Sequence, residues 1–305
     1  MNHKLWLGLL LALPGAFVGV VVALLVRGWL RRRAVWQQRL ALLYLRTLTA
    51  MAGGQWRLYG FRFIDRPGAR LALAEALAVM NRTWLDGDPA LLRSVMRGYD
   101  LEAMLLRRLR IPWMRTRALR LLAHLPVSRQ AAQRLERMSL PRHREMRFAL
   151  LRARINASPV QGIDWLRAHR DPLSPLECRE LMTMLLRGAF PIAYGPLLMA
   201  PEENLRRLGL CLVRHFGIEQ AVGRVRTLTS DAGVGREALE VLCDLHHPIP
   251  EFASAPLTPR ERRILLHRAA AEGYALQGLG EGLSREEQQA FKRLAACYTI
   301  AQRWA

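Results

Sequence analysis

Arg117-Ala-Leu-Arg-Leu-Leu122 and Arg207-Leu-Gly-Leu-Cys-Leu-Val213 share a short pattern in which an arginine precedes mainly apolar residues. Similar stretches begin at Arg147 and Arg236, so the four arginines lie 30, 60 and 29 residues apart. Glu177-Cys-Arg-Glu-Leu-Met-Thr-Met-Leu185 falls within the doubled interval. Apolar residues recur at helical spacing, whereas the alternation that is typical of strands is almost absent. The sequence therefore predicts an all-α protein in which a helix and a shorter partner repeat about every 30 residues.

The pattern resembles HEAT and armadillo-type repeats, most clearly from about residue 113 to 245, although a HEAT unit is usually longer. The resemblance implies an α-solenoid of short helical pairs over residues 68–257, in which neighbouring pairs bury one another's apolar faces. An irregular helical bundle is the alternative. We expect residues 258–305 to form C-terminal capping helices, because they carry one apolar stripe at helical spacing. The stripe consists of Phe291, Leu294, Ala295 and Tyr298.

Several helix starts are marked by capping signals, in which Ser or Thr precedes Glu or Gln by three residues. The four predicted capping boxes are Ser158 with Gln161, Ser174 with Glu177, Thr258 with Glu261, and Ser284 with Glu287. Asp88-Pro89 is expected to open another helix, because proline favours the first helical position.

An uncharged segment of 22 residues extends from Leu5 to Val26. As a helix it would span roughly 30 Å, the thickness of the hydrocarbon core of a bilayer. The basic cluster follows the segment, which favours a retained transmembrane anchor over a cleaved signal peptide. The residues expected at the membrane interface are Trp6, Trp29, Arg27, Arg31, Arg32 and Arg33.

The positions of these arginines also predict an orientation. The positive-inside rule places the N-terminus outside and the C-terminal domain in the cytoplasm, at the inner (plasma) membrane of a bacterium. Residues 1–30 then form the anchor, and residues 31–67 form a juxtamembrane helix and a linker. Gly53-Gly54 is expected to end that helix.

Positive charge is concentrated toward the N-terminus. The net charge is +21, yet residues 171–305 contain 16 basic and 16 acidic residues. Residues 103–135 contain eight arginines and no acid, and arginine forms bidentate contacts with phosphate or carboxylate. We therefore expect a surface for an anion or a partner in this stretch. The candidate residues are Arg107, Arg108, Arg110, Trp113, Arg115 and Arg120.

Four interpretations of this basic surface remain open. It could face anionic lipid, bind an acidic segment of a protein, bind nucleic acid, or simply be solvated. The decline of positive charge with distance from the anchor favours lipid or a membrane-bound protein over nucleic acid. A nucleic-acid-modifying enzyme would need a base pocket beside the surface, for which Trp113 and Asp100 are the nearest candidates. A membrane anchor argues against that role.

No motif indicates catalysis or a cofactor, since a P-loop, a dinucleotide fingerprint and a nucleophile elbow are all missing. Cys178, Cys211 and Cys243 lie 33 and 32 residues apart, so we expect them in similar core positions of successive repeats. A zinc site at Cys243-x-x-His246-His247 would lack a second pair of ligands. His143 and His169 are predicted to be surface residues.

These features together predict a non-catalytic, membrane-tethered scaffold or adaptor that presents helical repeats to a membrane-associated protein partner. Bacterial proteins with one N-terminal membrane helix and short HEAT-like repeats often serve membrane assemblies. The resemblance implies, as the preferred assembly, a membrane glycosyltransferase system for exported polysaccharide. The alternative is a regulatory receptor that binds a signalling domain or an anionic ligand on its arginine-rich face. The sequence gives no indication of the oligomeric state.

Overall fold

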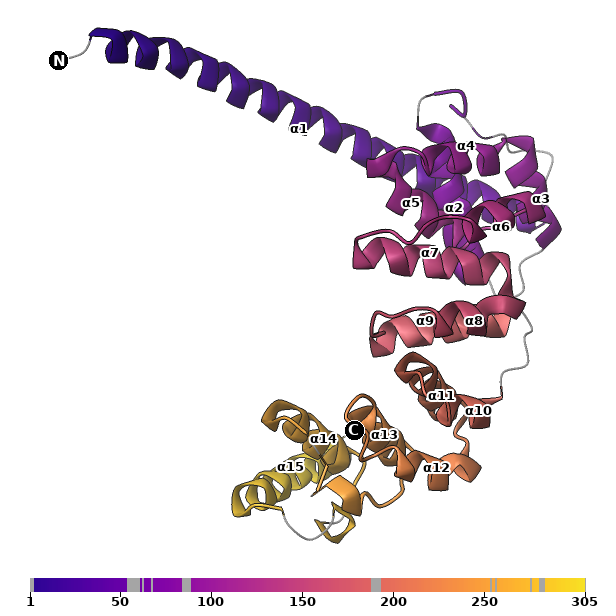
Figure 1. Ribbon diagram of the computed structural model, residues 1–305, viewed down its shortest axis with the longest axis vertical. Helices are drawn as coiled ribbons and strands as arrows, with labels where there is room; N and C mark the ends of the chain where they lie inside the picture. Colours follow the sequence, from indigo (N-terminus) through magenta and orange to yellow (C-terminus); the bar gives the residue numbers. More distant parts are fainter. Residues whose placement is uncertain are drawn as a thin grey trace. The chain divides into compact units, whose positions relative to one another are not determined.

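A computed structural model describes the backbone of residues 3–53, 61, 63–66, 68–83, 89–187, 193–252, 254–255, 257–274, 276–279 and 283–304. Within its helices, the side chains of residues 3–19, 89, 276–277 and 299–304 are not described. The described residues are mainly helical and include no strand, so the all-α prediction is confirmed (Figure 1). The chain divides into two compact units, unit 1 at Met1–Ala153 and unit 2 at Arg154–Ala305.

Unit 1 begins with a single helix of 50 residues, α1 (His3–Ala52). The predicted helix end at Gly53 is confirmed, while Gly54 lies outside the described residues. The later helices are α2 (Ala69–Thr83), α3 (Pro89–Gly98), α4 (Leu101–Arg108), α5 (Pro112–Leu122), α6 (Arg129–Glu136) and most of α7 (Arg144–Ala157). α3 opens at Pro89 as expected, but its predicted cap Asp88 is not described.

The C-terminal part of α1 joins unit 1 through one helix face. Leu40, Tyr44 and Leu48 are buried and lie four residues apart, so they point to the same side. The Tyr44 ring meets Phe61 edge-on with centroids 5.4 Å apart, and Phe61 meets Tyr99 at 5.3 Å. This face packs against α2, which buries most of its own leucines and alanines. α1 is therefore fixed to the unit over its last three turns.

Residues 20–35 of α1 are exposed, apart from the half-buried Gly28. Its exposed large apolar side chains are Val20, Val21, Val22, Leu24, Leu25, Val26, Trp29, Leu30 and Val35. Among the described residues, no helix combines the length and the apolar character that crossing a membrane requires. Most of the segment from Leu5 to Val26, Trp6 included, lies among the side chains that are not described.

Unit 2 consists of short helices in which α-helices alternate with 3₁₀ turns, labelled η. After the end of α7 come η1 (Pro159–Gln161), α8 (Gly162–Arg167), α9 (Pro175–Arg187), α10 (Tyr194–Leu198) and α11 (Glu203–Phe216). They are followed by η2 (Glu219–Ala221), α12 (Val222–Thr227), α13 (Gly235–Asp244) and η3 (Pro250–Phe252). The C-terminal elements are α14 (Pro259–Ala271), η4 (Leu276–Leu279) and α15 (Arg285–Trp304).

The helix boundaries repeat along the sequence. Longer helices begin at Pro112, Arg144, Pro175, Glu203 and Gly235, which are 32, 31, 28 and 32 residues apart. A shorter helix or 3₁₀ turn follows each of them. These intervals agree with the repeat length expected from the sequence, although they do not identify the type of repeat.

Three of the longer helices share a contact that the sequence analysis missed. The fourth residue of α5, α7 and α11 is an arginine whose side chain donates to a backbone carbonyl six residues earlier. The contacts are Arg115 Nε to Leu109 O at 2.8 Å, Arg147 Nη1 to Pro141 O at 3.4 Å, and Arg206 Nη1 to Ala200 O at 2.9 Å. The arginine thus fixes the preceding loop against its own helix.

Three of the four capping boxes predicted from the sequence are present in the structure. The capping boxes at Ser174, Thr258 and Ser284 each form both reciprocal hydrogen bonds. The prediction at Ser158 is wrong, because a 3₁₀ turn follows this residue and its side chain makes no cap hydrogen bond. The sequence analysis also missed Ser128, whose Oγ accepts a hydrogen bond from the first turn of α6.

Two predictions about individual side chains need correction. His169 is buried rather than exposed, with Nε2 lying 3.8 Å from Asp171 Oδ2. Cys211 and Cys243 are each the ninth residue of their helices, whereas Cys178 is the fourth residue of α9, so only two of the three cysteines occupy equivalent positions.

The apolar stripe of α15 packs as expected on the core of unit 2. Phe291 is buried in that core, and Leu294, Ala295 and Tyr298 lie partly buried against it.

Candidate functional site

The two units differ strongly in charge. Residues 1–153 contain 27 Lys and Arg against 8 Asp and Glu, a formal net charge of +19. Residues 154–305 contain 19 against 17, a net of +2. A net charge of this size attracts acidic partners and anionic surfaces, so unit 1 is the better candidate for such an interaction.

At least eight arginines of unit 2 form ion pairs with carboxylates of the same unit. Glu240 of α13 accepts hydrogen bonds from Arg236 at 2.9 Å and from Arg268 of α14 at 3.2 Å. Arg214 of α11 pairs with Glu240 and Asp244. These ion pairs join successive helices. The charged residues that form them are therefore explained by the packing of unit 2, without a ligand.

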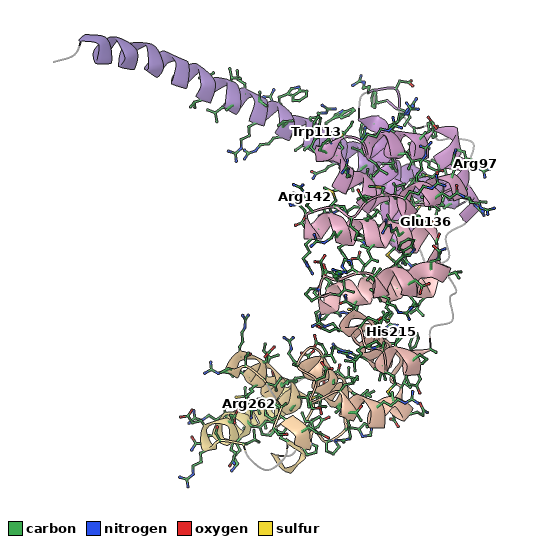
Figure 2. The ribbon with its side chains drawn as sticks, viewed as in Figure 1. Arg97, Trp113, Glu136, Arg142, His215 and Arg262 are labelled. Atoms are coloured by element: carbon green, nitrogen blue, oxygen red, sulfur yellow. The ribbon has the colours of Figure 1, made fainter. Side chains whose placement is uncertain are left out.

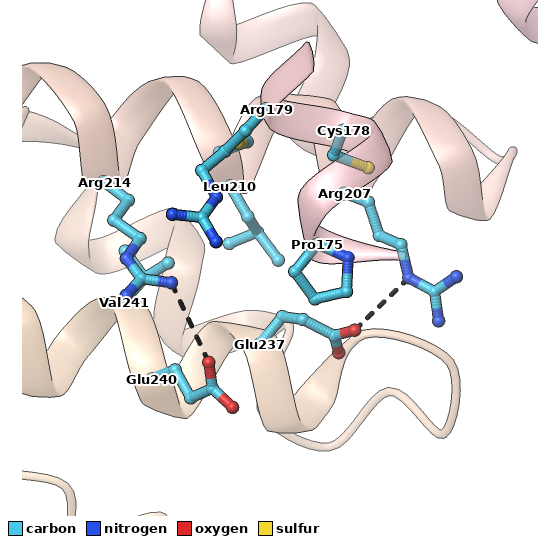
Figure 3. Close-up of a pocket in the computed structure, with 10 residues that line it drawn as sticks. Pro175, Cys178, Arg179, Arg207, Leu210, Arg214, Glu237, Glu240 and Val241 are labelled. Carbon is cyan, nitrogen blue, oxygen red and sulfur yellow. Dashed lines mark ion pairs between the residues drawn. The ribbon is translucent and has the colours of Figure 1, made fainter. Parts of the chain in front are cut away.

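A small cavity lies beside this network, between α9, α11 and α13 (Figure 3). Figure 3 shows Arg207 directed toward Glu237 and Arg214 toward Glu240 at its rim, with Cys178 also in the lining. Its volume is about 40 Å³, whereas ligand sites usually occupy roughly 300–1,000 Å³. The cavity has space for a water molecule or two, and we assign it no substrate.

The predicted surface residues of unit 1 lie in different environments. Arg107 pairs with Asp100 at 3.3 Å, and Arg120 pairs with Glu145 of α7 at 3.3 Å. All four side chains are exposed, so each pair contributes little to stability. Arg115 instead holds the loop before α5 through the carbonyl of Leu109. Arg107 and Arg120 remain accessible to a partner, while Arg115 has a structural role.

Arg110 and Trp113 are the most open of the predicted residues. Arg110 is exposed and has no ion pair among the described residues. Trp113, in the first turn of α5, is 82% exposed (Figure 2). An indole on the surface beside arginines is typical of residues that contact a membrane interface or a partner protein.

Arg108 differs from its neighbours because part of its charge is buried. It is the last residue of α4, and its Nη1 is inaccessible to solvent and has no hydrogen-bond partner. Burial lowers the pKa of this guanidinium, and the nearby charges of Arg117 and Arg33 lower it further, while Glu75 opposes them.

Arg117 of α5 makes hydrogen bonds to residues of both α2 and α1. Its Nε donates to Glu75 Oε1 of α2 at 2.7 Å, and its Nη2 donates to Gln37 Oε1 of α1 at 3.4 Å. Gln37 follows Arg33 by four residues, so both lie on the same face of α1. The structure thus places Arg33, predicted for the membrane interface, near Arg108, predicted for the anion surface.

Two of these neighbouring residues are not among the predicted candidates. Arg117 belongs to the arginine-rich stretch 103–135 but is not one of its candidate residues, and Gln37 carries no sequence signal. Their proximity depends on α1 and α5 both packing against α2, which local periodicity does not specify. We refer to Arg33, Arg108 and Arg117 as the arginine cluster.

The remaining interface residues lie along the exposed part of α1. Arg27, Arg31 and Arg32 are exposed, and the Arg33 guanidinium lies 5.2 Å from the centre of the Trp29 ring. A cation over an indole face is a favourable arrangement that also orients the arginine. This contact holds Arg33 beside the apolar side chains that precede it.

Within the described part of the chain, no three His, Cys, Asp or Glu side chains are grouped so that they could hold a metal ion. No protein-family model matches the chain, and no curated protein or solved structure matches it significantly.

Proposed function

We propose that this protein is a non-catalytic adaptor tethered to the bacterial inner membrane by the first part of α1, with the rest of the chain in the cytoplasm. The observation that carries the tether is the exposure of large apolar side chains along residues 20–30, immediately before Arg31, Arg32 and Arg33. In water, such a surface is unfavourable by about 25 cal/mol per Å². A bilayer would bury it, and the arginines would remain among the headgroups.

The adaptor role is proposed from the helical repeats and the charge difference between the units. Helix pairs at intervals of 28–32 residues support HEAT-like repeats, a class that generally binds proteins over extended surfaces. In unit 1 the exposed Arg110 has no ion pair among the described residues, and the net charge of the unit is +19, whereas that of unit 2 is +2. The proposed partner is therefore an acidic, membrane-associated protein that contacts unit 1.

The proposed assembly is a membrane glycosyltransferase system for exported polysaccharide, which rests on the resemblance in architecture alone. Tethering would serve an adaptor of this kind, because confinement at a membrane raises the effective concentration of two partners without any new contact.

Alkaline carbonate extraction and reporter fusions test the tether. The full-length protein should remain in the membrane pellet, and a C-terminal green fluorescent fusion should fluoresce while an alkaline phosphatase fusion stays inactive. Leu24→Arg with Leu25→Arg should release the protein, since each arginine in an apolar span costs about 2.5–3.5 kcal/mol. Gln38→Arg, on the exposed side of α1 beyond the basic cluster, is the matched control. Release of the wild-type protein by carbonate would contradict the tether.

The adaptor role is tested by gentle detergent extraction and mass spectrometry of the proteins that remain bound. One sample carries Arg107→Glu, Arg110→Glu and Arg120→Glu in unit 1. The control carries Arg260→Glu, Arg263→Glu and Arg293→Glu, three exposed arginines of unit 2. A stoichiometric membrane enzyme that is retained by wild type and control but lost from the unit 1 variant would support the proposal. Recovery of the protein alone from all three samples would contradict it and favour the receptor alternative.

A further inference from the structure

The arginine cluster combines three positive charges from three helices. Arg33 comes from α1, Arg108 from the end of α4 and Arg117 from α5, and Glu75 of α2 is the one carboxylate that acts on Arg108 among the described charges. The cluster therefore keeps two uncompensated positive charges. The charges of Arg33 and Arg117 repel that of Arg108, and a folded protein retains such an arrangement at a cost in stability unless an anion neutralises it.

The cluster is also held in position before any ligand arrives. Glu75 fixes Arg117 through a hydrogen bond of 2.7 Å, and Gln37 contacts the same guanidinium. Stacking on Trp29 orients Arg33. The buried Nη1 of Arg108 lacks an acceptor. The oriented guanidinium groups of Arg33 and Arg117, with the charge of Arg108 beside them, suit a group with several anionic oxygens, which describes a phosphate better than a single carboxylate.

We propose that Arg33, Arg108 and Arg117 bind the phosphate group of an anionic lipid, an inference that rests on the membrane tether proposed above. Arg33 follows Leu30 by three residues and Trp29 by four, and both of these side chains are exposed. Acyl chains of a lipid bound at Arg33 would therefore lie along the apolar surface of α1. A free phosphate compound would leave that surface uncovered.

The depth of Arg33 relative to the proposed span agrees with a headgroup. Val26 is the last residue of the uncharged segment, and Arg33 lies seven residues, or roughly 10 Å, beyond it along the helix. The polar headgroup layer adds about 5–8 Å to each side of the hydrocarbon core. The long side chain of Arg33 can close the difference by extending toward the membrane.

Trp113 provides a second point of contact. It precedes Arg117 by four residues on α5, so both lie on one face of that helix. An exposed indole next to a phosphate site is well placed to enter the interfacial layer, where tryptophan is enriched. The lipid site and Trp113 would together hold unit 1 against the membrane surface.

The test uses full-length protein in a nonionic detergent and dioctanoyl phospholipids as soluble probes. Binding is measured by microscale thermophoresis with phosphatidic acid, phosphatidylglycerol and phosphatidylcholine, and separately with inorganic phosphate. We expect the two anionic lipids to bind about 10-fold or more tightly than phosphatidylcholine. Arg108→Gln and Arg33→Gln should each weaken that binding about 10-fold. Arg97→Gln and Arg137→Gln, which are exposed arginines of unit 1 outside the cluster and outside the candidate surface, should change it less than about twofold.

Thermal unfolding of the same samples separates loss of binding from loss of fold. Arg108→Gln removes a partly buried charge from a positive environment, so the lipid-free variant should melt at the wild-type temperature or above it. Phosphatidylglycerol should raise the melting temperature of the wild type but not that of the variant.

Several results would overturn the lipid site. Equal binding by Arg108→Gln and wild type would exclude the cluster as the site. Equal affinity for inorganic phosphate and for phosphatidic acid would show that the ligand is a free phosphate compound rather than a lipid. Because these measurements are made in detergent and without a partner, they are independent of the extraction experiments that test the tether and the adaptor.

Discussion

Arg262 of α14 donates a hydrogen bond from Nε to Oε1 of Glu287, in the first turn of α15, at 2.6 Å. The other oxygen of this carboxylate accepts the backbone N–H of Ser284 at 3.0 Å and thereby caps α15. Nη1 of Arg262 also donates to the carbonyl of Phe252 in η3, and its guanidinium lies over the Phe252 ring. The side chain of Arg262 thus links α14, α15 and η3.

Replacing this carboxylate should destabilise unit 2. Glu287→Gln removes the charge from both the cap and the ion pair, and we expect a loss of about 1–2 kcal/mol in the free energy of unfolding. Urea unfolding followed by circular dichroism measures the loss. Glu286→Gln changes the adjacent exposed residue in the same turn and should have an effect below about 0.5 kcal/mol. Equal effects would show that the contact to Arg262 is unimportant.

The same carboxylate should make stability depend on pH. The hydrogen bond from Arg262 holds the pKa of Glu287 below its usual value. A lowered pKa in the folded state contributes stability that is fully present above the unfolded pKa, about 4.3, and is lost as the pH falls through the folded value. Unfolding free energies measured from about pH 6 to pH 3 should therefore fall less steeply for Glu287→Gln than for the wild type. Parallel curves would contradict this assignment.

Substitution of Asn204 should destabilise the protein more than substitution of an exposed polar residue. Its side chain is buried, accepts the N–H of Leu173 at 3.1 Å and donates to the carbonyls of His169 and Asp171. Asn204→Ala leaves these backbone groups without their side-chain partner, and we expect a loss of about 2–4 kcal/mol. Gln220→Ala, an exposed polar truncation in η2, should change stability by less than about 0.5 kcal/mol. A small effect of Asn204→Ala in urea unfolding would show that water replaces the amide.

A close approach of two helices depends on Gly209. A Cβ at this position of α11 would lie 3.1 Å from Leu197 Cβ and from the backbone nitrogen of Leu198, both at α10. Gly209→Ala should therefore destabilise the protein by about 1–3 kcal/mol. Gly223→Ala meets no atom within 4 Å and should be neutral or stabilising by up to about 1 kcal/mol. Thermal unfolding of the two variants should shift in opposite directions or by clearly different amounts.

The four cysteines should differ in reactivity. Burial raises the pKa of the Cys178 thiol to about 12 and of the Cys243 thiol to about 11, and it also raises the pKa of Cys211. Cys297 is exposed. At pH 8 a thiol reagent should label Cys297 rapidly, and Cys297→Ser should remove the fast phase. Rapid labelling of more than one thiol in the folded protein would contradict the burial of the others.

Local features of the fold were predictable from sequence. Capping boxes at Ser174, Thr258 and Ser284 depend on residues three positions apart, and the intervals between longer helices follow from a periodic apolar pattern. Departures occurred where distant segments decide the structure. His169 is buried because Asn204, 35 residues later, binds its carbonyl in the core. Asp100 adopts a left-handed backbone conformation between α3 and α4, which its local sequence does not predict.

The candidate surface was predicted only as a stretch of sequence. The structure separates Arg115, which holds a loop, from Arg110 and Trp113, which face solvent. The proximity of Arg108 to Arg33 could not be read from the chain, because the two residues are 75 positions apart and meet through the packing of α1.

The continuity of α1 determines how unit 1 would be held at a membrane. The helix runs without a break from His3 to Ala52, and its buried face begins at Gln37 and Leu40, which leaves no hinge between the proposed span and the body of the unit. Leu40 lies 14 residues beyond Val26, or roughly 21 Å of helix. In the proposed orientation α1 is a rigid connection between the bilayer and the rest of unit 1. Its tilt and its rotation in the bilayer then fix the height and the facing direction of unit 1.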